Sequence, residues 1–195
     1  MSAGRPAVFL DRDGTINEEV DFVRTPEELQ LIPGAARAIR RLNESGFVTC
    51  VISNQSGIAR GFLSERELED IHEKLQEELR REDARVDRIY YCPHHPTEGK
   101  PPYNITCPCR KPNPGMLLAG QAEFSLDLSR SFVVGDRIVD VQVGKAVGAT
   151  TILVLTGYGR IAAEECKDAG VTPDYVLASL PEAVKIIVGK NGSNG

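Results

Sequence analysis

The sequence predicts an α/β fold with a doubly wound, mostly parallel, Rossmann-like sheet and helices on both faces. Short apolar runs of strand length alternate along the chain with longer segments whose apolar residues recur at helical spacing. Strands that alternate with helices usually pair in parallel, because each crossover brings the chain back to start the next strand from the same edge. The 195 residues are enough for one well-buried domain and too few for two. We therefore expect one domain over residues 1–188 and a disordered tail at 189–195.

Each predicted element has its own local signal. Buried strands are expected where four or more apolar residues stand together, as they do at the start of the chain. Gly46 ends the first helix, Ser64 and Glu67 have the spacing of a capping box, and Asn113 with Pro114 is typical of an N-cap followed by a first helical residue. Strands are expected at 7–10, 47–52, 86–91, 131–134, 151–155 and 174–177, and helices at 35–45, from 65, from 114, at about 138–147 and at 180–188.

Chemically active side chains follow directly after the predicted strands. They are Asp11 and Asp13, then Ser53, then Lys111 at the end of a long loop, then Asp136 with Asp140. Each has a plain alternative, because Asp-Gly and Ser-Asn-Gln-Ser-Gly are also ordinary turn sequences and a single loop lysine is usually just solvated. Since the carboxyl ends of parallel strands share one edge of the sheet, we expect these residues to converge there. That convergence favours a functional site.

Three of these residues, Asp11, Asp13 and Asp136, indicate a site for a hard cation, and Mg²⁺ suits oxygen ligands. A carboxylate can attack a phosphate ester only if the repulsion between anions, about 4 kcal/mol per pair near 4 Å at a dielectric constant near 20, is offset. A divalent cation and Lys111 are of the right size to offset it. We then expect Asp11 to be the nucleophile and to form an aspartyl-phosphate. Asp13 would protonate the leaving oxygen and later activate water, and Ser53 would bind phosphate oxygens.

A second cluster lies in the loop at 92–110, which has no helical or strand periodicity. Cys92-Pro-His94-His95 and Cys107-Pro-Cys109 supply four ligands of the kind that tetrahedral Zn²⁺ binds. Spacing does not decide between His94 and His95, and three reduced cysteines at accidental spacing are the plain alternative. Three thiolates and one imidazole leave no open position, so the zinc is expected to be structural and to hold Arg110 and Lys111 in place.

The remaining composition narrows the function further. A net charge of −5 argues against a nucleic-acid-binding protein, since phosphate neutralisation needs a basic surface. No apolar run has the length of a membrane span and the N-terminus has no signal-peptide core, so we expect a cytoplasmic protein without a membrane partner. Cys50, Cys166 and His72 are expected to have no special role.

The motifs resemble those of a known family. Asp11-Arg-Asp13-Gly-Thr, Ser53, Lys111 and Gly135-Asp136 are similar to the four motifs of the haloacid dehalogenase-like phosphatases, in the right order over nearly the whole chain. More narrowly, Ser-Asn-Gln-Ser-Gly-Ile-Ala-Arg-Gly, Tyr-Tyr-Cys-Pro-His-His-Pro and Cys-Arg-Lys-Pro-Asn-Pro-Gly-Met resemble the branch that removes the 7-phosphate from D-glycero-D-manno-heptose 1,7-bisphosphate. The resemblance implies magnesium, a zinc loop, no large cap domain, and a place in lipopolysaccharide or S-layer sugar synthesis.

The resemblance also implies individual roles. Asp11, the backbone carbonyl of Asp13, and Asp136 would hold magnesium, Ser53 and Lys111 would stabilise the phosphoryl group, and His94 rather than His95 would bind zinc with the cysteines. The partner would be a small sugar bisphosphate, bound by a monomer. Substrate contacts would come from Arg110, Arg137, Asn54, Gln55, Ser56, Glu19, Val20, Asp21 and Phe22.

This chain departs from the family pattern at two places. Arg137 stands where many members have lysine, and Asp21-Phe22-Val23 replaces a Gly-Tyr pair before the valine. Histidinol-phosphate phosphatase, with a related zinc loop, is the alternative within the class, although the Cys-Arg-Lys-Pro-Asn-Pro-Gly-Met run favours the heptose enzyme. A receiver-like signalling domain with a lasting phosphoaspartate, or a silent zinc module, would leave the position of Asp13 unexplained.

Overall fold

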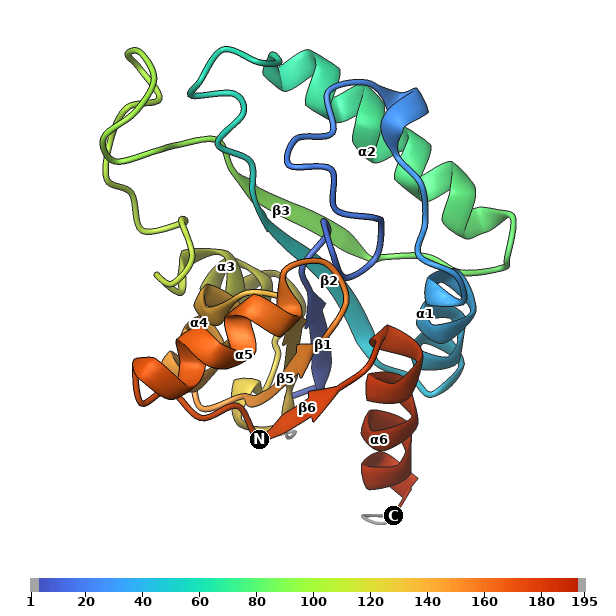
Figure 1. Ribbon diagram of the computed structural model, residues 1–195. Coiled ribbons are helices and arrows are strands. Elements are labelled where there is room, and N and C mark those ends of the chain that lie inside the picture. Colours follow the sequence, from blue (N-terminus) through green and yellow to red (C-terminus); the bar gives the residue numbers. More distant parts are fainter. Residues whose placement is uncertain (1–3, 193–195) are drawn as a thin grey trace.

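The computed structural model describes residues 4–192, and the predicted α/β class is confirmed. Six strands form one sheet in the order β3-β2-β1-β4-β5-β6, and every neighbouring pair is parallel (Figure 1). The strands are β1 (Ala7–Leu10), β2 (Val48–Asn54), β3 (Arg88–Cys92), β4 (Phe132–Gly135), β5 (Thr150–Val154) and β6 (Tyr175–Leu177).

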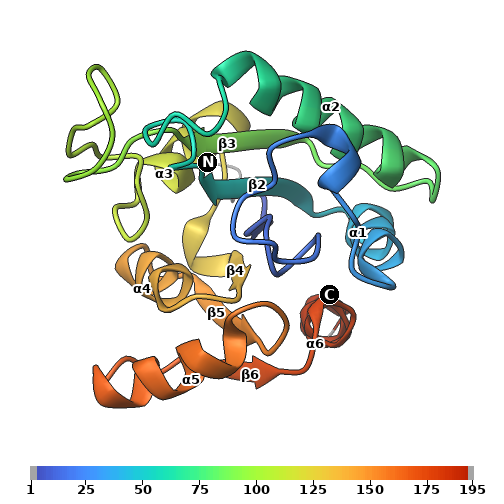
Figure 2. The same ribbon diagram turned by 45° about the horizontal axis from the view of Figure 1, so that its top comes forward.

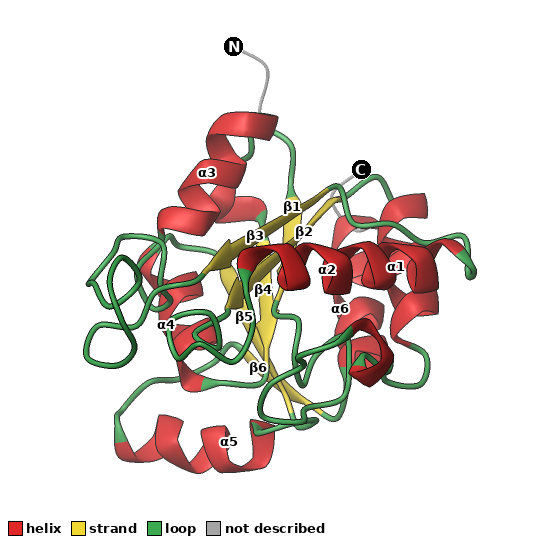
Figure 3. Ribbon diagram, turned by 90° about the horizontal axis from the view of Figure 1, so that it is seen from above, coloured by secondary structure: helices red, strands yellow, loops and turns green. Residues whose placement is uncertain are grey.

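Helices cover both faces of the sheet. Figures 2 and 3 show α1, α2 and α6 on one side and α3, α4 and α5 on the other. The helices are α1 (Ala35–Glu44), α2 (Glu65–Arg80), α3 (Gly115–Phe124), α4 (Ile138–Ala146), α5 (Gly159–Asp168) and α6 (Leu180–Gly192), with short 3₁₀ turns η1 (Pro26–Glu28) and η2 (Leu128–Arg130). None of the helices in this described part of the chain is long and apolar enough to cross a membrane.

The alternation of side chains along β1 explains why its sequence is apolar throughout. Val8 and Leu10 belong to the core beneath α1, α2 and α6, whereas Ala7 and Phe9 belong to the core beneath α3. All four are fully buried because the strand lies in the middle of the sheet with helices over both faces. The same burial holds for most of β2 and for β4.

The main differences from the prediction concern three helices. Helix α3 begins at Gly115 with Pro114 at the N-cap position, and Asn113 instead donates a side-chain hydrogen bond to the carbonyl of Cys107 at 3.0 Å. Helix α6 continues to Gly192, so residues 189–192 are helical and not part of a disordered tail; residues 193–195 lie outside the described part. Helix α5 had no strong sequence signal because only small residues, Ala162 and Cys166, anchor it to the core.

The capping box at the start of α2 is present as the sequence predicted. The Ser64 hydroxyl accepts from the Glu67 backbone N–H at 3.2 Å, and the Glu67 carboxylate accepts from the Ser64 backbone N–H at 2.7 Å. This cap ends the connection that follows β2 and fixes where that connection turns back. The carboxyl ends of the strands are thereby left open on one edge of the sheet.

Candidate active site

A cleft of about 500 Å³ opens at the carboxyl edge of the sheet. Most of the side chains expected there do line it, which brings together residues from the ends of β1, β2 and β4 and from the loop after β3. Its lining is Asp11, Asp13, Glu19, Asp21, Phe22, Ser53, Asn54, Ser56, Arg60, Arg110, Lys111, Pro112, Arg137 and Val139. Of the residues predicted to converge here, Val20, Gln55, Asp136 and Asp140 do not line it. A larger hollow of about 800 Å³, next to η1 and α1, contains none of the strand-end residues.

Three buried carboxylates form a floor beneath the cleft, and of these only Asp11 lines it. Carboxylate oxygens of Asp11, Asp136 and Asp140 lie within 4.8 Å of one another. Burial, followed by the charges of Asp140 and Asp13, raises the pKa of Asp11 to about 7. Burial and the charges of Asp11 and Asp140 raise the pKa of Asp136 to about 8. A nearby positive charge would therefore stabilise the ionised form of both carboxylates.

Lys111 supplies part of that charge. Its ammonium group lies 2.6 Å from Asp140 Oδ1, 3.0 Å from Asp11 Oδ1 and 2.8 Å from the carbonyl of Ile52. Burial opposes the charged form of Lys111, but the two carboxylates outweigh it and raise its pKa to about 12. The other oxygen of Asp140 accepts from the backbone N–H of Arg137 at 3.0 Å. Both oxygens of Asp140 therefore accept hydrogen bonds, and the residue positions Lys111.

Asp11 and Asp136 fit a hard cation. Oδ1 of Asp136 is buried and has no hydrogen-bond partner among residues 4–192, while Oδ2 accepts from the backbone N–H of Tyr158 at 2.8 Å. A buried carboxylate oxygen without a donor is costly, and a divalent cation would satisfy it. The carboxylate of Asp13 is not part of this cluster.

Asp13 lies instead among hydrogen-bond donors. Its oxygens accept from the guanidinium of Arg12 at 2.9 Å, from Asn17 Nδ2 at 2.9 Å and from Gln55 Nε2 at 2.9 Å. Burial would raise the pKa of Asp13, but Arg12 and these donors outweigh it and hold that pKa below its usual value. Arg12 is fully buried, so a charged side chain that the sequence did not single out is the counter-ion of Asp13.

The end of β2 connects these parts. The side chain of Asn54 donates to the Lys111 carbonyl at 3.1 Å and accepts from the Lys111 backbone N–H at 3.0 Å, which fixes the lysine loop to the strand. Gln55 Nε2 donates to the Ser53 hydroxyl at 2.7 Å as well as to Asp13. Gln55 therefore lies behind the cleft and orients two residues that line it.

Two glycines allow the backbone to approach Asp136 closely. A Cβ at Gly14 would lie 2.0 Å from Asp136 Oδ2, and one at Gly157 would lie 2.2 Å from the same atom. Both glycines have positive φ, +75° and +51°, which other residues rarely adopt. The hydroxyl of Thr156 donates to the Gly14 carbonyl. The loop after β5 thus packs against the loop after β1, which makes it a further strand end at the site.

The cleft also has a basic wall. Arg110 Nη1 donates to the His94 carbonyl at 3.0 Å, so the zinc loop holds it as the sequence suggested. Arg60 was not singled out, although it stands in the Ser-Asn-Gln-Ser-Gly-Ile-Ala-Arg-Gly run that carries the family resemblance. Its guanidinium forms an ion pair with Glu98 of the zinc loop and lies 5.9 Å from the Phe22 ring.

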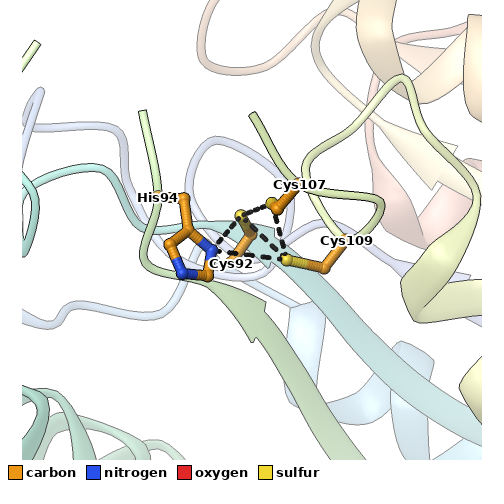
Figure 4. A group of neighbouring side chains, drawn as sticks. All are labelled: Cys92, His94, Cys107 and Cys109. Carbon is orange, nitrogen blue, oxygen red and sulfur yellow. Dashed lines mark hydrogen bonds between the residues drawn. The ribbon is translucent and has the colours of Figure 1, made fainter. Parts of the chain in front are cut away.

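The four predicted zinc ligands converge (Figure 4). The Sγ atoms of Cys92, Cys107 and Cys109 lie 2.9 to 3.3 Å from one another, and His94 Nδ1 lies 3.6 Å from Cys109 Sγ and 3.7 Å from Cys92 Sγ. His95 is not in the group, and its Nδ1 accepts from the Glu98 backbone N–H at 3.0 Å. The arrangement fits a closed tetrahedral site with His94 as the nitrogen ligand.

Comparison with known proteins identifies the family. Residues 108–183 match the family described as HAD-hydrolase-like. The D-glycero-D-manno-heptose-1,7-bisphosphate 7-phosphatase of Thermosynechococcus vestitus is 44% identical over 187 residues, which cover 94% of this chain and 95% of the relative. The chain belongs to the D-glycero-D-manno-heptose-1,7-bisphosphate 7-phosphatase family. The D-glycero-beta-D-manno-heptose-1,7-bisphosphate 7-phosphatase of Escherichia coli K12 is 40% identical over 95% of this chain and 96% of its own length.

A solved structure from this family has the same fold. The D,D-heptose 1,7-bisphosphate phosphatase from B. bronchiseptica, crystallised in complex with magnesium and phosphate, superposes with a TM-score of 0.84 at 32% identity. The match covers 95% of this chain and 99% of that one. The family resemblance seen in the sequence motifs is therefore confirmed, and a fold without a large cap domain is shared by both proteins.

Proposed function

We propose that this protein hydrolyses the 7-phosphate of D-glycero-D-manno-heptose 1,7-bisphosphate in a magnesium-dependent reaction. Family membership at 44% identity supports the substrate. The observation that carries the chemistry is the floor of the cleft, where Asp11 lies 3.0 Å from the buried ammonium of Lys111 and next to Asp136. This arrangement suits a carboxylate that must approach an anionic phosphate.

In the proposed mechanism Asp11 attacks phosphorus and the bond to the sugar oxygen breaks. Lys111 and the Ser53 hydroxyl stabilise the charge on the transferring phosphoryl group, and Asp13 gives a proton to the leaving oxygen. Water then attacks the aspartyl-phosphate while Asp13 takes up its proton, which releases phosphate and restores Asp11. Asn54 and Gln55 position Lys111, Ser53 and Asp13 for these steps.

The environment of Asp13 explains how one carboxylate serves both steps. Arg12 holds it in the ionised form, which is the form needed to activate water. The protonated form needed for the first step is favoured when an anionic phosphate enters the cleft, because a like charge raises a carboxyl pKa. The substrate's own phosphate titrates near pH 6 and can bring the proton with it.

Two metals complete the proposal. Mg²⁺ would be held by the carboxylates of Asp11 and Asp136 and by the backbone carbonyl of Asp13, where it supplies positive charge that neutralises the carboxylates and polarises the phosphoryl oxygen. Zn²⁺ would be held by Cys92, His94, Cys107 and Cys109 and would act structurally.

Substrate recognition would fall to the rim of the cleft. We assign it to the basic wall and to the loop after β1, and we treat residues 1–188 as one domain that acts as a cytoplasmic monomer. A thiolate zinc site fits a reducing compartment. The assigned residues are Arg110, Arg137, Asn54, Ser56, Glu19, Asp21 and Phe22, whereas Gln55 would act only through Ser53 and Asp13, and Val20 does not line the cleft.

Phosphate release from a panel of substrates tests this function. The panel contains both anomers of the heptose bisphosphate, the heptose 7-phosphate and histidinol phosphate, with Asp11→Asn as the inactive control. We expect a heptose bisphosphate to give the highest kcat/KM, no turnover without magnesium, and none by the control. A preference for histidinol phosphate, or a lasting phosphoprotein without phosphate release, would refute the proposed function.

A further inference from the structure

Tyr158, at the start of α5, contacts three parts of the site at once. Its backbone N–H donates to Asp136 Oδ2 at 2.8 Å, the guanidinium carbon of Arg137 lies 3.9 Å from its ring centroid, and its hydroxyl donates to Asp21 Oδ1. No sequence motif singled it out. It does not line the cleft but borders a side hollow behind residues 18–21, so it is placed to act on the loop and not on the substrate.

The backbone of Tyr158 is anchored independently of its side chain. Gly157 packs against Asp136 and Gly14, and the Thr156 hydroxyl donates to the Gly14 carbonyl. Tyr158 therefore has a fixed base on the floor of the cleft. Arg137, which contacts its ring, and Asp21, which contacts its hydroxyl, are therefore positioned relative to Asp136.

The 19–22 loop is held at one end, where the Phe22 ring packs edge-to-face on Phe62 with 4.9 Å between the ring centroids, but its tip at Val20 and Asp21 lies beyond that contact. Asp21 has a φ of +62°, a left-handed conformation that costs energy for a residue other than glycine. The Phe22 backbone N–H donates a hydrogen bond within the loop itself, to the Val20 carbonyl at 2.7 Å. The Val20 side chain is 48% exposed. The hydrogen bond from Tyr158 to Asp21 ties the tip of this loop to the floor, and the ion pair of Glu19 with Arg137 holds its other end.

Arg137 is held by the same ring. Its planar guanidinium faces Tyr158, and its Nη2 lies 3.4 Å from Glu19 Oε2 at the other end of the loop. A lysine at position 137 would keep the charge but would lose the flat surface that stacks on an aromatic ring. The arginine that departs from the family pattern is therefore matched to Tyr158.

We propose that Tyr158 is a positioning residue for substrate selectivity, which clamps the 19–22 loop and Arg137 onto the floor of the cleft. This rests on the proposed function, because the loop matters only if part of the substrate extends beyond the transferring phosphoryl group. Tyr158 touches no reacting atom. Its loss should weaken recognition of a large substrate and leave the chemical step unchanged.

Tyr158→Phe removes the hydroxyl and keeps the ring. This hydrogen bond is exposed to solvent, and a bond of that kind is worth about a threefold to tenfold change in an equilibrium constant, so KM for the heptose bisphosphate should rise by that factor while kcat stays constant. p-Nitrophenyl phosphate does not reach the loop, and its kcat/KM should not change. Tyr158→Leu, which also removes the stacking with Arg137, should raise KM further. Tyr175→Phe is the matched control, since its ring faces Lys190 away from the cleft.

Amide hydrogen exchange tests the clamp without any substrate. In Tyr158→Phe the amides of residues 19–22 should exchange faster than in the wild type, and in Tyr175→Phe they should not. Combined with Asp21→Asn, which keeps a weaker acceptor at this position, the change in exchange should not be additive, because both substitutions act on the same contact.

The outcomes separate the clamp from the proposed function. Equal losses on both substrates, or unchanged exchange in the loop, would overturn the clamp and leave the phosphatase assignment intact. A wild type that does not hydrolyse the heptose bisphosphate would refute the proposed function, and the exchange experiment would still decide for or against the clamp.

Discussion

Replacement of Asp11 by asparagine should stabilise the magnesium-free protein while it abolishes turnover. Asp11 shares a buried floor with Asp136 and Asp140, and each such carboxylate pair within 4.8 Å costs about 3.5 kcal/mol at a dielectric constant near 20. The attraction between Asp11 and Lys111 at 3.0 Å stabilises the folded state by about 5.5 kcal/mol at the same dielectric constant. The two repulsions together exceed this attraction by about 1.5 kcal/mol, before any cost of burial.

The sign of the pH dependence follows from the raised pKa of Asp11, about 7 against 3.8 for an unperturbed side chain. Below about pH 4 the carboxyl is protonated in both folded and unfolded chains and contributes nothing. As the pH rises, the unfolded chain loses its proton first, so the wild type loses stability up to about pH 7. The asparagine variant escapes this loss. Its melting temperature should exceed that of the wild type by about 3 to 6 °C at pH 8 and by little near pH 4.

Thermal melts in buffers without magnesium, at pH 4.5, 6 and 8, measure the difference. Asp168→Asn, which removes an exposed charge at the end of α5, is the matched control and should show no such trend. Added magnesium should raise the melting temperature of the wild type more than that of Asp11→Asn, because the cation neutralises the carboxylates. A variant that melts below the wild type at pH 8 would show that the floor is not electrostatically strained.

Three further substitutions test the other parts of the site. Lys111→Met should lower kcat by about 100-fold to 1000-fold in phosphate-release assays, because it removes the cation that offsets the phosphoryl charge. Cys109→Ala should abolish bound zinc by elemental analysis, lower the melting temperature, and raise KM through the adjacent Arg110. Asp13→Asn should reduce turnover of the sugar phosphate by about 100-fold or more, and p-nitrophenyl phosphate should then give a burst, because nitrophenolate leaves without a proton and the aspartyl-phosphate accumulates.

Each of these predictions can fail separately. A Lys111→Met variant with near-normal kcat would mean that another group carries the phosphoryl charge. Full activity without zinc would show that the metal does not position Arg110. Equal slowing of both substrates by Asp13→Asn, without a burst, would remove Asp13 from its proposed proton-transfer role.

The convergence of these strand-end residues could be predicted because strand ends are marked locally. Asp11, Ser53 and Asp136 each follow an apolar run whose length and burial can be read without coordinates, and parallel pairing brings their ends together. The zinc ligands could also be predicted from the sequence, since Cys-x-His and Cys-x-Cys pairs seldom arise by chance. The resemblance that favoured His94 over His95 agrees with the ring that faces the thiols.

What the sequence missed depends on contacts between distant segments. Arg12 stands between two aspartates, but nothing local indicates that its guanidinium turns inward to pair with Asp13. Arg60 gains its place only through Glu98, 38 residues further along the chain. Tyr158 follows Thr-Gly and precedes Gly, a run that is typical of a turn and hides its bond to Asp21, 137 residues away.

The close approach of Gly14 and Gly157 to Asp136 has a consequence for mutational scans. A methyl group at either position would overlap a carboxylate oxygen at about 2 Å, and both backbones have positive φ. Alanine at these positions should therefore be as damaging as alanine at Asp136 itself, although neither glycine has a side chain to lose. A survey of tolerated substitutions would therefore identify Gly14 and Gly157 as residues essential to the active site. Neither has a functional group, and their contribution is the space that the missing side chain leaves for Asp136.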